Sequence, residues 1–368
     1  MKFFLQLSLF GALYCLPFFT LVNAQTPFTS SVSAINQPSS PRDFFDNDGV
    51  LSIKLSGNLR ELINDRGENP KYHSLIFSYK ADRTEVSFAV EARTRGHFRK
   101  EAGNCNYPPI LLHFLKSDSL NASIFKGQTT LKLVMPCQGD EYVVREWMVY
   151  KMYELITPKS FRARLVRVEL NDTKKKKSTS PFYGILLEEE EHMALRNQTV
   201  LLKRKMRPEQ IDPGSFLTMA VFEYLIGNTD WSVQYLQNIK LLATDSNSVP
   251  VTVPYDFDHA GVVNTPYAKP AEELEMSSVM ERRYRGYCVP DMKKFDSVIA
   301  LYNHLKTAFY QMYTGCELLD AKYIKTTISY FDEFYKTVND PVSLQKEFSY
   351  PCDKNKTGNV VIKGMKND

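Results

Sequence analysis

Four polar residues have the types and spacing of a site for a hard metal ion. Asn238 opens one strand-like run, and Asp256 and Asp258 close the next one in VPYDFDHAG. A hairpin with Asn238 at its start and Asp256 at its end brings both side chains to the same end. Such oxygen ligands suit Mg²⁺ or Mn²⁺, which needs only one or two carboxylates beside phosphate oxygens and water. Asp258 would support Asp256, while Asp230, which follows a predicted helix end, would orient and deprotonate an attacking hydroxyl.

The same residues also have an ordinary structural interpretation. Asp and Asn favour turns and strand ends because their side chains hydrogen-bond to nearby backbone groups. The spacing alone fits this interpretation at least as well as it fits a metal site. The chain contains no GxSxG, HExxH or GxxxxGK[ST] motif, so it lacks the usual signatures of those hydrolases and P-loop enzymes.

The predicted secondary structure changes along the chain from mainly strands to mainly helices. Short apolar runs from residue 50 to 135, such as SLIFSYKA and TTLKLVM, predict strands. A helix is expected over 141–156, followed by a hairpin made of RARLVRVEL and FYGILLEEEE. After residue 206 we expect a helix, a second hairpin and two long amphipathic helices. The predicted fold class is α+β with two lobes: an N-terminal antiparallel β lobe with one helix, and a mainly helical C-terminal lobe.

Five segments, in order, resemble the CotH-like family of spore coat protein kinases over roughly residues 85–345. They are EARTRGHFR, VVREWMVYKMYEL, RVEL with FYGILLEEEE, NTDWSVQYLQN and VPYDFDHAG. The resemblance implies an atypical protein-kinase-like fold and transfer of a phosphoryl group from ATP or another nucleotide. It implies Asp230 as the catalytic base and Asn238 and Asp256 as metal ligands. One departure is that Asn238 follows Asp230 by eight residues, where kinases usually have five.

A second departure concerns the residues that would hold the nucleotide phosphates. The family's basic residues are missing before the strand PPILLHF, so we select Lys132, the lone charge in the apolar run TTLKLVM. Either Glu146 or Glu190 would hold this lysine in place; a surface lysine whose stem lies along apolar neighbours is the alternative. Arg93 and Arg95 precede a glycine, which fits a turn facing phosphates and equally an exposed basic turn.

The N-terminus has the pattern of a secretory signal peptide. Residues 1–24 contain one lysine, a long apolar run and a small-residue cleavage pattern before Gln25. An uncleaved membrane anchor is the alternative, and no later segment is apolar enough to span a membrane. We therefore expect a secreted, periplasmic or cell-envelope protein that can form disulfides. Cys105 with Cys137, and Cys288 with Cys352, are the expected pairs.

The net charge of +4 is small for 368 residues and indicates no nucleic-acid partner. The basic run Lys174–Lys177 is expected to form an exposed loop tip. The predicted organisation is a signal peptide (1–24), a flexible leader (25–48), an N-lobe (49–205), a C-lobe (206–350) and a tail (351–368). The expected function is metal-dependent phosphoryl transfer to a protein or glycan acceptor at the cell envelope. A catalytically inactive kinase-like binding module and a calcium-stabilised scaffold are the alternatives.

Overall fold

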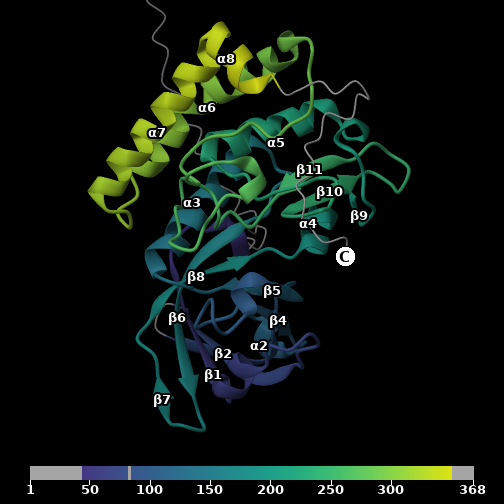
Figure 1. Ribbon diagram of the computed structural model, residues 1–368. Helices are drawn as coiled ribbons and strands as arrows, with labels where there is room; N and C mark the ends of the chain where they lie inside the picture. Colours follow the sequence, from purple (N-terminus) through teal and green to yellow (C-terminus); the bar gives the residue numbers. More distant parts are fainter. Residues whose placement is uncertain (1–43, 82–83, 350–368) are drawn as a thin grey trace, which may run out of the picture. The chain divides into compact units, whose positions relative to one another are not determined.

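The N-terminal part of the protein is a closed β-barrel. The computed structural model describes residues 44–81 and 84–349, and Figure 1 shows the barrel below the helical part. Its strands are, in order around the barrel, β1 (Leu51–Gly57), β2 (His73–Ala81), β3 (Thr84–Thr94), β4 (Ile110–Phe114), β5 (Thr130–Val134), β8 (Phe182–Leu187) and β6 (Ala163–Asp172). All neighbours are antiparallel except β1 and β6, whose parallel pairing from Leu51 opposite Val166 to Gly57 opposite Asp172 closes the sheet.

The predicted fold class is therefore wrong. A closed seven-stranded mixed barrel is not the open antiparallel lobe of a kinase-like fold. Alternating apolar residues identify strands and hairpin neighbours, but they do not reveal a parallel pair formed by strands more than a hundred residues apart. The prediction also missed the second sheet's third strand, β9 (Val200–Leu202), which pairs with β10 (Ile239–Ala243); β10 in turn pairs with β11 (Val251–Pro254).

Strands β5, β6 and β8 have apolar residues on both faces, because each separates two hydrophobic cores. Leu133 and Leu186 point into the barrel, which is filled by aromatic rings such as Phe77 and Phe125. Val134 and Ile185, one residue along each strand, belong to the second core outside the barrel. Such strands carry near-continuous apolar runs instead of simple alternation. This arrangement leaves Lys132 of β5 on the same side as the second core.

The second core is built by helices and the small sheet. Helix α3 (Asp140–Ile156) packs on β6 and β8, and α6 (Asp296–Thr314) packs on α3, α5 (Pro213–Ile226) and α7 (Ala321–Asn339). Helix α5 also covers β11, while α8 (Pro341–Phe348) packs on α7 (Figure 1). The shorter elements of the described part are η1 (Phe44–Asp46), α1 (Leu59–Asn64), η2 (Phe98–Lys100), α2 (Asp118–Asn121), β7 (Lys177–Ser178), α4 (Glu190–Arg196), η3 (Pro208–Gln210), η4 (Glu272–Leu274) and η5 (Met292–Phe295).

One disulfide fastens the loop after β3 to the start of α3. Cys105 and Cys137 are bonded with their Cα atoms 4.6 Å apart, which confirms the expected pair. Cys352, the expected partner of Cys288, lies outside the described residues, as do the predicted signal peptide and most of the leader. The described residues all belong to one compact unit. Within the part of the chain that is described, no helix is long and apolar enough to cross a membrane.

Candidate functional site

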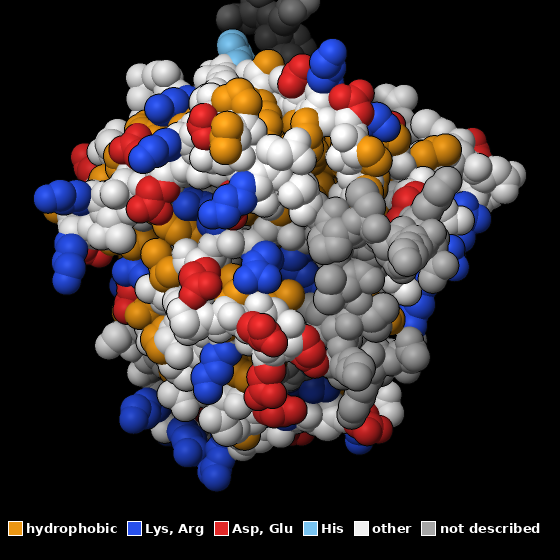
Figure 2. Space-filling view, turned by 45° about the horizontal axis from the view of Figure 1, so that its top comes forward, with side chains coloured by type: hydrophobic (Ala, Val, Ile, Leu, Met, Phe, Trp, Pro, Cys, Tyr) orange, Lys and Arg blue, Asp and Glu red, His pale blue; other side chains and the backbone are white. Residues whose placement is uncertain are grey.

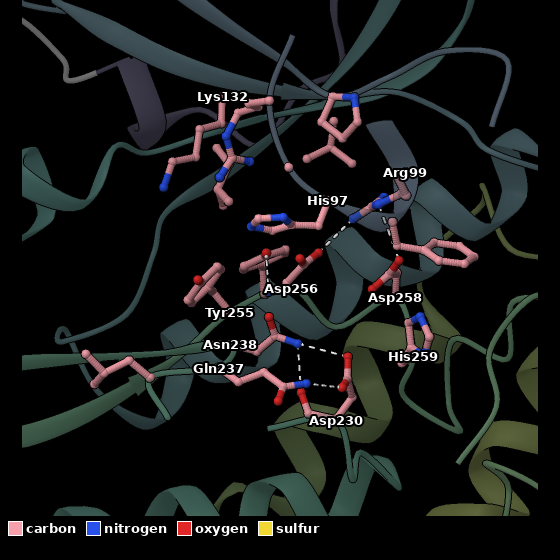
Figure 3. A pocket seen from close by; sticks show the side chains of 18 of the residues that line it. His97, Arg99, Lys132, Asp230, Gln237, Asn238, Tyr255, Asp256, Asp258 and His259 are labelled. Carbon is pink, nitrogen blue, oxygen red and sulfur yellow. Dashed lines mark hydrogen bonds and ion pairs between the residues drawn. The ribbon is translucent and has the colours of Figure 1, made fainter. Parts of the chain in front are cut away.

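A cavity of about 570 Å³ lies where the barrel meets the second sheet. The barrel side contributes the loop Arg95–Arg99, Pro109 just before β4, and Lys132 of β5. The other side contributes the loops before β10 and after β11, including Asp230, Asn238 and Asp256. Figure 3 shows these side chains facing one another across the cavity. Clefts where two structural parts meet are common ligand sites.

Lys132, which lines the cavity, belongs to what we call the cation cluster: Lys132, Lys240 and the carboxylate of Glu190 that the two lysines share. The Lys132 side chain is almost fully buried, and its Nζ lies 3.8 Å from Oε2 of Glu190. Nζ of Lys240 lies 2.6 Å from the same oxygen. The aromatic rings of Phe161 and Tyr255 lie 5.2 Å and 5.8 Å from the Lys132 ammonium, which partly compensates its lost hydration. Two cations thus share one acid.

The environment makes Lys132 responsive to an anion. Burial lowers the pKa of Lys132 to about 8. The nearby positive charge of Arg95 also lowers this pKa, whereas the carboxylate of Glu190 raises it. A bound phosphate would add negative charge beside the ammonium and stabilise its protonated form. Arg95 lines the cavity, and no ion pair or side-chain hydrogen bond engages its guanidinium among the described residues. Lys132 and Arg95 can therefore both serve an anionic ligand.

The acid cluster consists of Glu146, Asp256 and Asp258 around one guanidinium; Asp256 and Asp258 line the cavity, and Glu146 is buried beside them. Arg99, which is buried, lies 3.4 Å from Glu146, 2.7 Å from Asp256 and 3.3 Å from Asp258. Burial raises the pKa of Glu146, while Arg99 opposes this shift. For Asp256 burial also favours the neutral acid, but the positive charges of Arg99 and Arg95 lower its pKa. Three acids thus share one cation.

Asp230 lies below the acid cluster in a loop shaped by its own neighbours. Helix α5 ends at Gly227 in the left-handed conformation, where a Cβ would collide with the Tyr330 hydroxyl. The side chain of Asn228 then accepts a hydrogen bond of 3.0 Å from the Asp230 amide. Arg285 donates to the carbonyls on either side of Asp230, those of Thr229 and Trp231. The loop is therefore fixed by specific hydrogen bonds, and Asp230 is directed into the cavity.

Two amides orient the Asp230 carboxylate. Gln237 donates to its Oδ1, and Nδ2 of Asn238 donates to Oδ2 at 3.0 Å and to the Asp230 carbonyl at 2.7 Å (Figure 3). Burial raises the pKa of Asp230, and His259 opposes this. A carboxylate with a raised pKa is a better proton acceptor. The eight-residue spacing from Asp230 to Asn238 thus still brings the two side chains into direct contact, because a bridge between Ser232 and Gln237 closes the intervening loop.

Two of the predicted metal ligands have an uncommon backbone conformation. Asn238 has φ of 52° and Asp256 has φ of 64°, in the left-handed region where Asn and Asp are the best tolerated residues after glycine. The Asp256 amide donates to the Tyr150 hydroxyl at 2.9 Å, which fastens this turn to α3. Unusual backbone conformations of this kind concentrate at functional sites.

The donor set fits a cation that arrives with a phosphate ligand. One oxygen of Asp256 is engaged by Arg99, while the side chain keeps 43% of its surface exposed to the cavity. The amide oxygen of Asn238 is directed to the side where Asp256 lies (Figure 3). Asp258 is held by Arg99 and the Tyr267 hydroxyl, so it supports the cluster. Across the described ranges no three His, Cys, Asp or Glu side chains are grouped as a metal site. One carboxylate and one amide oxygen still suffice for Mg²⁺ when phosphates and water complete its shell.

The structure brings most of the predicted site residues together. Lys132, Glu190, Arg95, Asp230, Asn238, Asp256 and Asp258 all lie at or beside the cavity. Glu146 contacts Arg99 and not Lys132, so Glu190 is the acid that holds the lysine. Arg93 does not line the cavity; its guanidinium stacks on Tyr72 at 4.9 Å from the ring centre. Alternation alone would place residues 93 and 95 on one face, but β3 ends at Thr94, so Arg95 belongs to the loop that lines the cavity.

Sequence reasoning missed Arg99 and Lys240. The pattern that selected Lys132, a lone charge in an apolar strand, also fits Lys240 in NIKLL and could have identified it. Nothing in the sequence indicates that Arg99 meets acids more than forty and more than one hundred and fifty residues away. Neither a comparison with protein-family models nor a search of the curated proteins found a match to this chain. The site must therefore be interpreted from its own chemistry.

The surface offers no simple electrostatic alternative. On the described part of the face seen in Figure 2, Lys and Arg side chains are interspersed with Asp and Glu, without a continuous basic stripe. The turn that contains Lys174–Lys177 is exposed at the end of β6, as expected from its charge. This face therefore shows no basic surface of the kind that binds nucleic acid.

Proposed function

We propose that this protein transfers a phosphoryl group from a nucleoside triphosphate to a hydroxyl group of a protein or glycan acceptor, in a reaction that requires a divalent cation. The observation that carries the proposal is a single cavity that is lined by Lys132 and Arg95 and also by Asp230, Asn238 and Asp256. Lys132 belongs to a group with an excess of cations around Glu190, and Asp256 belongs to a group with an excess of acids around Arg99. The proposal rests on the site and not on the fold.

The cation cluster suits the phosphates of the donor. Lys132 and Arg95 would bind phosphate oxygens, and Glu190 would keep the lysine directed at them. Across the cavity, Asp256 and Asn238 would hold Mg²⁺ or Mn²⁺, which would neutralise charge on the phosphate oxygens. Arg99 would fix Asp256 so that its second oxygen stays directed into the cavity.

Asp230 would act on the acceptor. Its carboxylate would orient the acceptor hydroxyl and accept its proton as the hydroxyl oxygen attacks the terminal phosphorus. The bond between that phosphorus and the bridging oxygen breaks, and the nucleoside diphosphate leaves with the electron pair of that bond. The amides of Gln237 and Asn238 keep the base in one orientation throughout.

We propose further that this chemistry takes place after export. The Cys105–Cys137 disulfide supports an oxidising compartment, as does the composition of residues 1–24. The acceptor would then be a protein or glycan of the cell envelope or of a secretory compartment. A resemblance to the CotH-like family agrees with this function, and it stays a prediction.

The test is transfer of labelled phosphate from ATP with Mg²⁺ or Mn²⁺ by the mature chain. Asp256→Asn should abolish metal-dependent transfer, because it removes the carboxylate but tolerates the left-handed backbone. Asp245→Asn is the matched control, since Asp245 lies in the turn at the other end of the same hairpin. If the wild-type chain neither binds ATP nor transfers phosphate, or if Asp256→Asn behaves like the control, the proposal is wrong.

A further inference from the structure

A second hollow opens beside the cavity and is lined by basic and amide side chains. Its volume is about 280 Å³, and its lining consists of Lys205, Met206, Arg207, Gln210, Gln234 and Tyr235. Two of these residues, Lys205 and Tyr235, also line the main cavity. The two spaces therefore adjoin across the loop that carries Asp230 and Gln237.

The chain segment beside this hollow is the most basic one near the site. Between β9 and η3, four of five consecutive residues are basic: Lys203, Arg204, Lys205 and Arg207. None of the six residues that line the hollow is acidic. Glu191 does form an ion pair with Lys203 at 3.8 Å, but both side chains are about three-quarters exposed, so this pair is weak. Positive charge is thus in local excess.

The remaining lining residues are suited to a polypeptide. Gln234 offers an amide that can both donate to and accept from a peptide backbone. Tyr235 and Met206 add apolar surface, and the Lys205 ammonium lies 5.8 Å from the Tyr235 ring centre. Gln210 accepts a hydrogen bond of 2.8 Å from the Arg207 amide, which fixes the backbone at this edge of the hollow.

We propose that this hollow binds an acidic segment of a polypeptide acceptor and so presents the neighbouring hydroxyl to Asp230. The inference rests on the proposed function. Lys205 and Arg207 are two residues apart, and side chains at that separation in an extended chain lie about 7 Å apart. An acceptor with acids at alternate positions has the same spacing. Arg282 and Arg285, which follow VPYDFDHAG in the sequence, are poorer candidates, because Arg282 packs on Tyr330 and Arg285 holds the Asp230 loop.

The test compares two charge reversals of equal size. Arg207→Glu changes the lining of the hollow, and Lys174→Glu changes the exposed turn between β6 and β7 by the same net charge. The probe is a fluorescent peptide with one serine and glutamates at alternate positions; its glutamine counterpart is the reference. Anisotropy is measured with nucleotide-free wild-type and variant chains.

The expected result is at least about tenfold weaker binding of the glutamate peptide by the Arg207→Glu variant, with the turn variant close to wild type. Equal affinity for both peptides, no measurable binding, or an equal loss in the turn variant would overturn the inference. So would stronger competition by a sulfated oligosaccharide than by the glutamate peptide. Labelled-ATP transfer is followed in parallel: peptide binding without transfer contradicts the proposed function alone, and transfer without acidic preference contradicts the inference alone.

Discussion

The cation cluster around Glu190 and the acid cluster around Arg99 face the same cavity with opposite charge ratios. In the first, two lysines share one carboxylate; in the second, three carboxylates share one guanidinium. Neither cluster is neutral on its own, so each can accept a charge of the opposite sign from a ligand. The cavity is therefore polarised, and an anion and a cation would bind at different parts of it. Four experiments test this contrast between the two clusters.

The largest effect is expected from Asp230→Asn. Phosphate transfer should fall by about 100-fold to 10,000-fold, because the amide cannot accept the acceptor's proton. Nucleotide binding should persist, since neither cluster is changed. The wild-type rate should rise with pH as Asp230, whose pKa is raised by burial, loses its proton. Initial rates across the acidic to neutral range measure both effects, and a variant with the wild-type rate and pH profile would remove Asp230 from the chemistry.

The next effect is expected from replacing Cys105 and Cys137 with serine. The disulfide closes a loop of 32 residues, so its loss should lower the free energy of unfolding by about 3.5 kcal/mol. Cys105 lies in the segment between β3 and β4 that also carries Arg99 to the acid cluster, so the metal concentration needed for half-maximal activity should rise. Denaturant unfolding and metal titrations measure the two effects. A less stable protein with an unchanged metal requirement would mean that the acid cluster holds this loop unaided.

Lys132→Met tests the cation cluster. Nucleotide affinity should fall by about tenfold to a hundredfold, as expected for the loss of a hydrogen bond to a charged group. Lys240→Met should have the smaller effect, because Lys240 is more exposed and lies closer to Glu190. Wild-type affinity should also decline as the pH passes about 8, where Lys132 loses its proton. Calorimetric titration with ATP measures these affinities. A larger loss of affinity in Lys240→Met than in Lys132→Met would mean that Lys240 is the main phosphate-binding lysine.

The smallest effect is expected from Glu146→Gln. The pKa of Glu146 is raised by burial, so the folded chain keeps a proton that the unfolded chain releases. The free energy of unfolding of the wild type should therefore decline as the pH rises above the usual range of a glutamate. In the variant this decline should be smaller by about 1 kcal/mol, because glutamine does not titrate. Denaturant unfolding at several pH values measures it. Glu169→Gln is the contrasting control: its ion pair with Lys54 lowers the pKa, so its contribution to stability increases with pH. Parallel pH profiles of wild type and Glu146→Gln would show that Arg99 keeps Glu146 ionised.

The sequence predicted the second sheet's hairpin and the residues on it because these depend on local order. Asn238 precedes the first strand of one short hairpin and Asp256 follows the second strand. Both therefore lie at the open end of the hairpin, because its strands are antiparallel. Lys132 was found because a charge interrupts an apolar strand. Closure of the barrel was not predictable in this way, since the β1–β6 pairing is parallel and long-range. Arg99 was missed for the same reason. Its three acidic partners come from distant segments of the chain, and the spacing of residues in the sequence does not indicate such long-range contacts.

Because the backbone at Asn238 and Asp256 is left-handed, only some substitutions there can report on the role of the side chain alone. In a saturation mutagenesis experiment, alanine and branched residues at these two positions would lose function partly through conformational strain, at a cost of the order of 1 kcal/mol or more. Glycine removes the side chain without that strain. Glycine, not alanine, is thus the reference that separates the chemistry of these two side chains from the shape of the turns that present them.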